Sequence, residues 1–170
     1  FVLISTVDVY PTPLLVDETM EIDAKSQQPY GEHRLQLEEF IKSKFKKHLI
    51  VRLPALFGKG LKKNFIFDLI HNQLLSAVHP ESSFQFYNIE NLWNDIKLLR
   101  GKKIQLCNIV SIPLKAGEIA LKSCGIKLLQ NDAVKILNYN IRSIQPGPWQ
   151  HQSVFTELMD FIKNERKLQK

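Results

Sequence analysis

Two short apolar runs, one on each side of a helical segment, most limit the folds that this chain can adopt. Residues 1–5 and 49–53 are short and rich in β-branched side chains, which is typical of strands buried on both faces. Residues 30–47 between them form an amphipathic helical pattern, and Pro54 stops the second run. A strand, a helix and a second strand in this order predict an α/β fold with a parallel sheet.

The rest of the chain continues this alternation of strands and helices. Prolines and acidic residues are frequent over residues 6–29, which predicts a loop there. Further strands are expected over 84–87, 103–110 and 134–141. Further helices are expected over 64–75 and 89–99, between Pro113 and Cys124, and from Ser153 onward. Gly125 is expected to end the third of these helices.

Composition excludes several classes of protein. The chain has 170 residues, of which 44% are hydrophobic, so a folded core is expected, and no run approaches the eighteen apolar residues of a membrane span. Two cysteines without close partners and five unpaired histidines predict no metal site and are compatible with a reducing cytoplasm. The chain begins at Phe1 without a methionine or a secretory signal, and we expect it to be part of a longer cytoplasmic protein.

The positive charge is concentrated in one stretch. The net charge is +6, and residues 31–63 hold nine bases against three acids. A basic chain can bind nucleic acid, but no stacking motif or zinc spacing accompanies these charges, so we expect no nucleic-acid partner. Four lysines are clustered near the predicted helix end, namely Lys42, Lys44, Lys46 and Lys47. Cations at this position stabilise the negative end of the helix dipole. A solvated basic surface is the favoured interpretation.

The helix that begins near Tyr30 carries the residues of greatest chemical interest. At about 100° per residue, five side chains fall within about 80° of one another and are expected to face the sheet: Tyr30, Arg34, Leu37, Ile41 and Phe45. A buried guanidinium requires a partner or a ligand. One interpretation is a tyrosine acid/base whose phenolate is stabilised by Arg34 one turn away. The alternative is that Arg34 extends to solvent or pairs with Glu38.

A hydroxyl pair lies at the end of the first predicted strand. Ser5 and Thr6 occupy that position, and open α/β sheets bind ligands at the carboxyl ends of their strands. The Thr6 hydroxyl is therefore a candidate to hydrogen-bond a substrate oxygen while Tyr30 transfers a proton. The alternative is that Thr6 only caps the following loop.

Four motifs occur in an order that resembles one enzyme family. The chain contains a Ser-Thr strand end followed by Val9-Tyr10, an Asp-Glu-Thr loop at 17–19, a Pro-Tyr-Gly-Glu-His-Arg helix start at 29–34, and an Arg strand that leads into a glycine turn at 52–60. The ordered set resembles the extended short-chain dehydrogenase/reductases, the NAD(P)-dependent epimerases, dehydratases and reductases of nucleotide sugars. The similarity extends to the end of the chain, through 85–87 and 138–142.

This resemblance implies a role for each matching residue. Thr6 corresponds to the substrate-activating hydroxyl, Tyr30 to the general acid/base, and Arg34 to the lysine that assists the tyrosine and holds the nicotinamide ribose. NAD or NADP is the implied cofactor. Two further groups follow from the resemblance: a strip beside the nicotinamide, Pro54, Ala55 and Leu56, and two cations for an anionic substrate, Lys62 and Lys63.

Three departures limit the resemblance. Arg34 replaces the family's lysine, and a planar guanidinium places its donors differently from an ammonium. Ala55 stands where sugar-nucleotide epimerases often have a substrate-binding asparagine. Only 29 residues precede Tyr30, and they contain no glycine-rich dinucleotide turn; the turn at 58–60 lacks the spacing of a phosphate loop.

These observations define the expected architecture. The chain is expected to be the C-terminal portion of such an enzyme, with a partial Rossmann-type sheet, flanking helices and a small substrate lobe. The expected division is 1–60 and 84–112 for the sheet, 61–83 and 113–150 for the lobe, and 151–170 for a closing helix and tail.

The expected function is a step in surface-polysaccharide precursor synthesis on a sugar or nucleotide-sugar substrate, with a homodimer possible for the parent enzyme. Without the glycine-rich loop, this chain alone is not expected to be active. The alternative is a non-catalytic, truncated Rossmann-like binding module.

Overall fold

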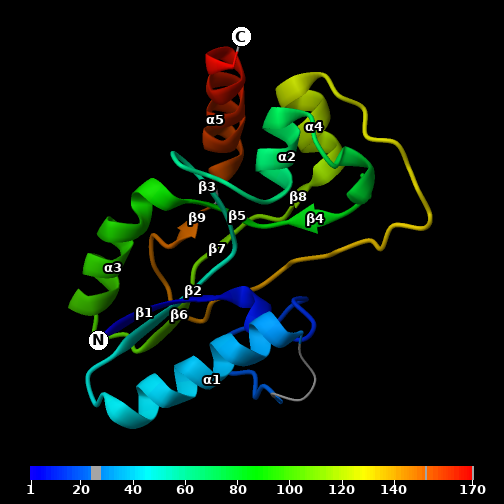
Figure 1. Ribbon diagram of the computed structural model, residues 1–170. Helices are drawn as coiled ribbons and strands as arrows, with labels where there is room; N and C mark the ends of the chain where they lie inside the picture. Colours follow the sequence, from blue (N-terminus) through cyan, green and yellow to red (C-terminus); the bar gives the residue numbers. More distant parts are fainter. Residues whose placement is uncertain (24–27, 152, 170) are drawn as a thin grey trace. The chain divides into compact units, whose positions relative to one another are not determined.

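The chain folds into two compact units. The computed structural model describes residues 1–23, 28–151 and 153–169 (Figure 1). Unit 1 comprises Phe1–Pro54, Asn91–Val110 and Asn140–His151, and unit 2 comprises Ala55–Glu90, Ser111–Tyr139 and Gln152–Lys170. No helix in the described ranges is long and apolar enough to cross a membrane.

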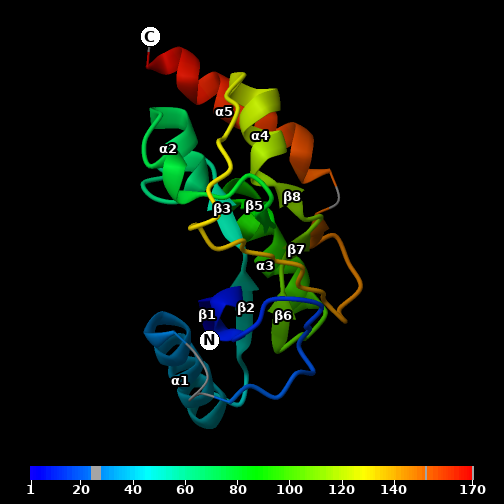
Figure 2. The ribbon, with the colours of Figure 1, turned by 90° about the vertical axis from the view of Figure 1, so that its right-hand side faces the viewer.

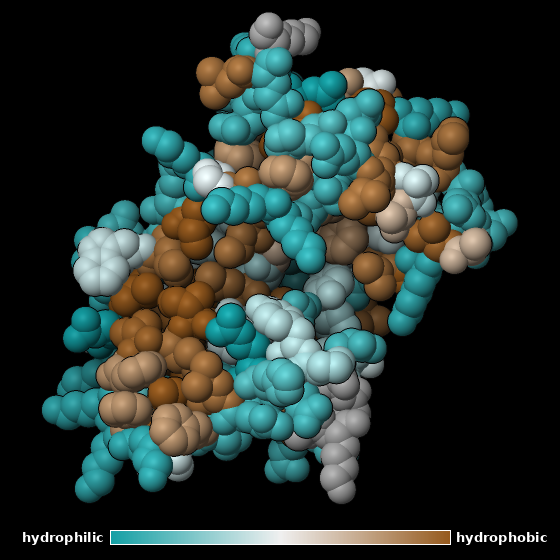
Figure 3. Space-filling model, viewed as in Figure 1, coloured by the Kyte–Doolittle hydropathy of each residue, from teal (hydrophilic) through white to brown (hydrophobic). Residues whose placement is uncertain are grey.

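A parallel sheet forms the centre of unit 1, which confirms the predicted α/β class. Its strands lie in the order β1 (Val2–Thr6), β2 (Leu49–Leu53) and β6 (Leu106–Asn108), with Ile4 opposite Val51 and Val51 opposite Cys107. Every residue of β2 is buried, as expected for the central strand of three. β1 is an outer strand whose Val2 and Ile4 are half-buried, and Figure 3 shows hydrophobic side chains gathered where β1 lies.

Helix α1 (Pro29–Lys44) packs against β1 and lies beside the sheet in Figure 2. Leu3, Ile41 and Ile50 form a small apolar cluster between the helix and the strands. The remaining elements of unit 1 are η1 (Val7–Val9), α3 (Leu92–Gly101), which contacts β2, and β9 (Gln150–His151).

The face of α1 that packs inward differs from the predicted one. The buried residues are Gly31, Leu35, Glu38 and Ile41. Of the predicted stripe, Ile41 is buried, but Leu37 and Phe45 are each 38% exposed and Tyr30 is 54% exposed. The helix is rotated in this way because Glu38 points inward to meet a buried arginine, described below, which the apolar pattern alone does not reveal.

The described residues of unit 2 form two small sheets and three α-helices. β3 (Ala55–Phe57) pairs in parallel with β5 (Phe86–Asn88), and β4 (Ser83–Phe84) pairs antiparallel with β8 (Leu114–Lys115). The other elements are α2 (Phe65–His71), η3 (Leu75–Ala77), η4 (Ile89–Asn91), β7 (Val110–Ser111), α4 (Ala116–Cys124) and α5 (Val154–Leu168), of which η4 and β7 begin or end in unit 1. The predicted stop at Gly125 is confirmed, because Gly125 ends α4 in the left-handed conformation with φ 68°.

Three predicted strands are wrong in part or in full. The segment 134–141 forms only isolated bridges at Asn138 and Asn140, because Ile136 and Leu137 remain 45% and 40% exposed and find no sheet to pack on. The predicted strand over 84–87 is divided at Gln85, whose side chain instead donates to the Ser111 carbonyl (2.6 Å). The predicted strand over 103–110 is confirmed only in part, because a turn with φ 58° at Lys103 precedes β6 and Ile109 separates β6 from β7.

Candidate functional site

The end of β1 carries the predicted hydroxyl. Thr6 is the last residue of β1 and is 8% exposed. Its Oγ1 donates to Asp8 Oδ2 (3.1 Å) and accepts from the Asp8 amide (3.1 Å), so it caps the short helix η1. The capping role that the sequence offers as the alternative is therefore present, and a role toward substrate stays a prediction.

Tyr30 and Arg34 lie together at the start of α1. The guanidinium carbon of Arg34 is 5.5 Å from the centroid of the Tyr30 ring, within the range of a cation–π contact. Arg34 Nη1 also donates to the Ile4 carbonyl in β1 (3.4 Å). Arg34 therefore contacts both Tyr30 and the strand that ends at Thr6. Tyr30 itself is half exposed, so its phenol is open to a ligand.

Glu38 does not pair with Arg34, contrary to one of the sequence interpretations. Glu38 lies two turns after Tyr30 on the buried face of α1, where it forms a two-point ion pair with Arg52 of β2. Arg52 Nη2 donates to Glu38 Oε2 (2.6 Å) and Arg52 Nε to Glu38 Oε1 (3.0 Å), while Ser5 Oγ also donates to Oε1 (2.6 Å). The carboxylate therefore joins α1 to both β1 and β2.

The network continues from Arg52 to the third strand. Arg52 Nη1 donates to Tyr10 Oη (2.8 Å), Asn108 Nδ2 of β6 donates to the same oxygen (2.9 Å), and Tyr10 Oη is within 2.8 Å of the Asp17 carbonyl, to which it donates. Burial raises the pKa of the Tyr10 phenol, although the charge of Arg52 opposes this rise. Burial alone lowers the pKa of Arg52, but the hydrogen bonds and charge of Glu38 outweigh it and raise that pKa.

The acidic loop of the second motif is also held by this unit. Glu18 Oε1 accepts from the backbone N–H of Asn108 (2.7 Å) and from Ser143 Oγ (2.6 Å). Glu18 Oε2 accepts from the backbone N–H of Ile144 (2.9 Å). Glu18 thus joins the loop to β6 and to the segment 140–151.

Sequence reasoning missed this polar network, although one signal was present. An arginine in the middle of a strand buried on both faces needs a carboxylate within reach, and Arg52 occupies that position. Glu38, on the preceding helix, was the residue to assign to it.

The other predicted site residues are distributed over both units. Pro54 is buried and follows β2 in unit 1, whereas Ala55 and Leu56 are half-buried in β3 of unit 2. Lys62 and Lys63 are exposed in unit 2 before α2, whose first amides are capped by Asn64 Oδ1 (3.0 Å to Ile66 N). Arg34 contacts Tyr30 and the Ile4 carbonyl of β1, the strand that ends at Thr6, whereas the two lysines belong to a different unit. Over the ranges that the structure describes, no group of three or more potential metal ligands converges.

No family model and no curated protein matches the chain. Solved structures do match. A UDP-glucose 4-epimerase from Thermotoga maritima with UDP-glucose has a TM-score of 0.74 at 14% identity, over 100% of this chain and 64% of that chain. The protein RMD from Pseudomonas aeruginosa complexed with NADPH has a TM-score of 0.70 at 15% identity, over 99% and 66%. A dTDP-4-dehydrorhamnose reductase from Bacillus anthracis in complex with NADP has a TM-score of 0.68 at 20% identity, over 96% and 65%.

These likenesses define the class of fold. The chain has a Rossmann-type fold like that of these solved structures, as the sequence motifs predict. It spans about two thirds of the length of these solved structures.

Proposed function

We propose that this chain is part of an NAD(P)-dependent epimerase, dehydratase or reductase that acts on a nucleotide sugar. One observation carries the proposal: Arg34 contacts both the ring of Tyr30 (5.5 Å) and the Ile4 carbonyl (3.4 Å), two residues before Thr6. A tyrosine with a cation one helical turn away can act as a general acid/base, and a hydroxyl at a strand end can hydrogen-bond the sugar oxygen.

Each of these residues has a distinct part in the proposed reaction. The Tyr30 phenol exchanges a proton with the sugar oxygen, and the positive charge of Arg34 stabilises the phenolate left behind. The Thr6 hydroxyl hydrogen-bonds the same sugar oxygen, exchanging its contact with Asp8 for one with substrate. The Glu38–Arg52 pair holds α1, the helix that carries Tyr30 and Arg34, against the strands.

The residues around Tyr30 fit a nicotinamide cofactor. A guanidinium carries five N–H donors, and among the described residues Arg34 donates one hydrogen bond, so donors remain for the ribose hydroxyls. By the family resemblance, Pro54, Ala55 and Leu56 lie beside the nicotinamide, which supplies and accepts the hydride when bound. The solved structures of this fold that contain NADPH or NADP support the choice of NAD(P) as the cofactor.

The substrate and the setting of the enzyme are part of the same proposal. Thr6 contacts the sugar, Lys62 and Lys63 meet the anionic portion of the substrate, and the product enters surface-polysaccharide synthesis in the cytoplasm. The whole enzyme is proposed to be a homodimer.

Cofactor binding is the test of this function. The chain and its Arg34→Ala and Tyr30→Phe variants are titrated into NADPH while the fluorescence of the nicotinamide is followed. We expect Arg34→Ala to weaken binding at least tenfold and Tyr30→Phe to leave it within about threefold, because Arg34 holds the ribose and Tyr30 moves a proton. Lys44→Ala, an exposed change at the other end of α1, is the matched control and is expected to have no effect. Absence of binding by the unmodified chain contradicts a role for these residues without further sequence.

A second candidate is a non-catalytic Rossmann-like binding module. The observation that favours it is the engagement of the Thr6 hydroxyl with Asp8, which leaves no free hydroxyl proton for a substrate oxygen. Saturation-transfer NMR with UDP-glucose in the presence of NAD distinguishes the two. Saturation transfer to both ligands that is lost in Arg34→Ala supports the enzyme, and saturation transfer that Arg34→Ala leaves unchanged supports the module.

A further inference from the structure

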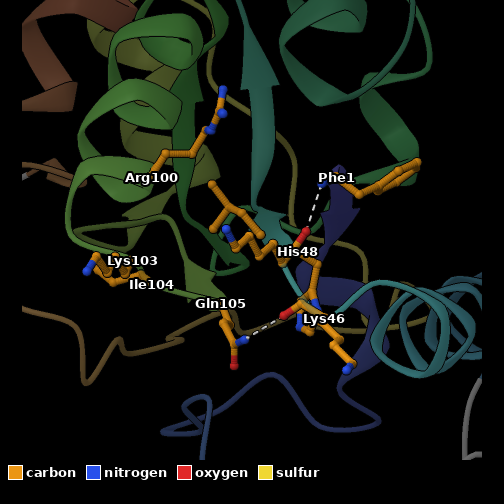
Figure 4. A pocket seen from close by; sticks show the side chains of 9 residues that line it. Phe1, Lys46, His48, Arg100, Lys103, Ile104 and Gln105 are labelled. Carbon is orange, nitrogen blue, oxygen red and sulfur yellow. Dashed lines mark hydrogen bonds between the residues drawn. The ribbon is translucent and has the colours of Figure 1, made fainter.

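A basic cavity lies at the amino-terminal ends of the three parallel strands of unit 1. It has a volume of about 460 Å³ (Figure 4). Its lining residues directly precede β1, β2 and β6, except for Leu49, which begins β2, and Arg100, which lies near the end of α3. Strands of five residues span roughly 16 Å, so this edge of the sheet is separate from the edge that carries Thr6. The cavity is therefore distinct from the candidate active site.

Positive charge dominates the lining of this cavity. None of its nine residues is acidic, and four are cations, namely Lys46, Lys47, Arg100 and Lys103. In the described part of the chain, every ion pair uses other residues, namely Lys42–Glu39, Arg52–Glu38, Lys115–Glu81, Lys122–Glu118 and His151–Asp95. None of these ion pairs neutralises a cation of the cavity, so an anion that binds there is attracted by the positive charge of those cations.

Helix dipoles account for only part of this charge. Cations stabilise the last turn of a helix, and Lys42, Lys44 and Arg100 already occupy the last turns of α1 and α3. Lys47 and Lys103 lie beyond the helix ends, in the turns that lead into β2 and β6. Their presence on one cavity is therefore not explained by the helices.

The turns that carry the cations are tied together. The Phe1 nitrogen donates to the Lys47 carbonyl (2.9 Å), and Gln105 Nε2 donates to the Lys46 carbonyl (3.5 Å), as the dashed lines in Figure 4 show. These bonds hold the turn before β2 to the segments before β1 and β6. A site whose walls are held before binding loses less entropy when a ligand binds.

The other five lining residues are mixed. Three are apolar, namely Phe1, Leu49 and Ile104, and two are polar, namely His48 and Gln105. Ligand pockets commonly occupy 300–1,000 Å³ and combine apolar walls with a few polar groups. We propose that this cavity binds a nucleoside phosphate, with the phosphates on the lysines and Arg100 and the base against the apolar wall.

Titration with pyrophosphate, ADP and adenosine tests this site. Calorimetry is expected to show pyrophosphate binding, tighter binding of ADP by threefold or more, and no binding of adenosine. The double variant Lys47→Gln/Lys103→Gln is expected to weaken the binding of pyrophosphate and of ADP at least tenfold, because it removes two of the four cations. The matched control, Lys127→Gln/Lys135→Gln, removes the same charge from exposed positions in unit 2 and is expected to change each Kd by less than twofold.

Several outcomes overturn the proposal. Absence of pyrophosphate binding, or equal weakening in both double variants, rejects a defined anion site. ADP binding no tighter than pyrophosphate rejects the nucleoside part. Loss of ADP binding in Arg34→Ala but not in Lys47→Gln/Lys103→Gln assigns the ligand to the proposed cofactor site instead. Binding of duplex DNA without pyrophosphate binding shows a nucleic-acid surface.

Discussion

The interiors of the two units are built from different chemistry. Unit 1 buries a carboxylate and a guanidinium at its centre, with Glu38 0% and Arg52 2% exposed, and surrounds them with hydroxyls and an amide. Unit 2 instead buries one large apolar cluster, in which α2, α4 and α5 contribute Ile66, Leu69, Ile119, Leu158 and Ile162. Hydrogen bonds depend on direction, whereas apolar contacts depend mainly on volume. The polar interior therefore specifies the rotation of α1, on which Tyr30 and Arg34 lie, in a way that an apolar interior does not.

Breaking the buried pair is expected to have the largest effect. Glu38→Gln keeps the size of the side chain but leaves Arg52 as an uncompensated buried charge, and such changes cost about 3–5 kcal/mol. Urea unfolding followed by amide hydrogen exchange at β1 and β2 measures the loss in unit 1. Glu39→Gln, next to it but exposed and paired with Lys42, is the control and is expected to cost less than about 1 kcal/mol. A loss below 1 kcal/mol in Glu38→Gln contradicts the role given to the pair.

The apolar interior of unit 2 is expected to respond to lost volume instead. Leu158 is fully buried, and Leu158→Ala is expected to lower the free energy of unfolding of unit 2 by about 2–5 kcal/mol. Amide hydrogen exchange in unit 2 measures this loss. Leu158→Met, which conserves volume, is expected to cost less than about 1.5 kcal/mol. Leu168→Ala, 81% exposed on the same helix, serves as the control. If Leu158→Met lowers the free energy of unfolding as much as Leu158→Ala does, the stability of the unit 2 interior does not depend mainly on side-chain volume.

This contrast also explains what the sequence could and could not predict. The two strands at 1–5 and 49–53 and the stop at Gly125 were predictable, because apolar runs and glycine report local requirements. The prediction of burial on both faces is confirmed for β2, whereas β1 is half-buried at Val2 and Ile4. The rotation of α1 was not, because a rule that places polar residues outside assigns Glu38 to solvent. The segment 134–141 has the composition of a strand, but a strand needs a partner edge, which composition does not report. The Tyr30–Arg34 contact was predictable from helical spacing, whereas the contact of Arg34 with Ile4 required the fold.

High pH is expected to act on the polar interior by a smaller amount. The pKa of Tyr10 is raised in the folded protein because the phenol is buried, so the folded state keeps a proton that the unfolded chain releases. Its contribution to stability is complete below about pH 10 and decreases as the pH rises through 10 and beyond. Urea unfolding of the chain and of Tyr10→Phe at pH 8 and pH 10.5 measures this. The decrease between the two pH values is expected to be larger for the unmodified chain, and equal decreases contradict the assignment.

The two cysteines extend the comparison without a change of sequence. Cys107 is buried in β6 beside Glu18 and Asp95, and burial above all raises the pKa of its thiol to about 12. Since the thiolate is the reactive form, a thiol of this pKa is roughly 10³-fold less ionised near pH 8 than an ordinary cysteine. Cys124 ends α4 in unit 2 and is partly exposed. Mass spectrometry after iodoacetamide treatment at pH 8 is therefore expected to show Cys124 modified first, and Cys107 only after Glu38→Gln or urea has opened unit 1. Equal modification rates in the folded protein contradict the closed interior that the buried ion pair maintains.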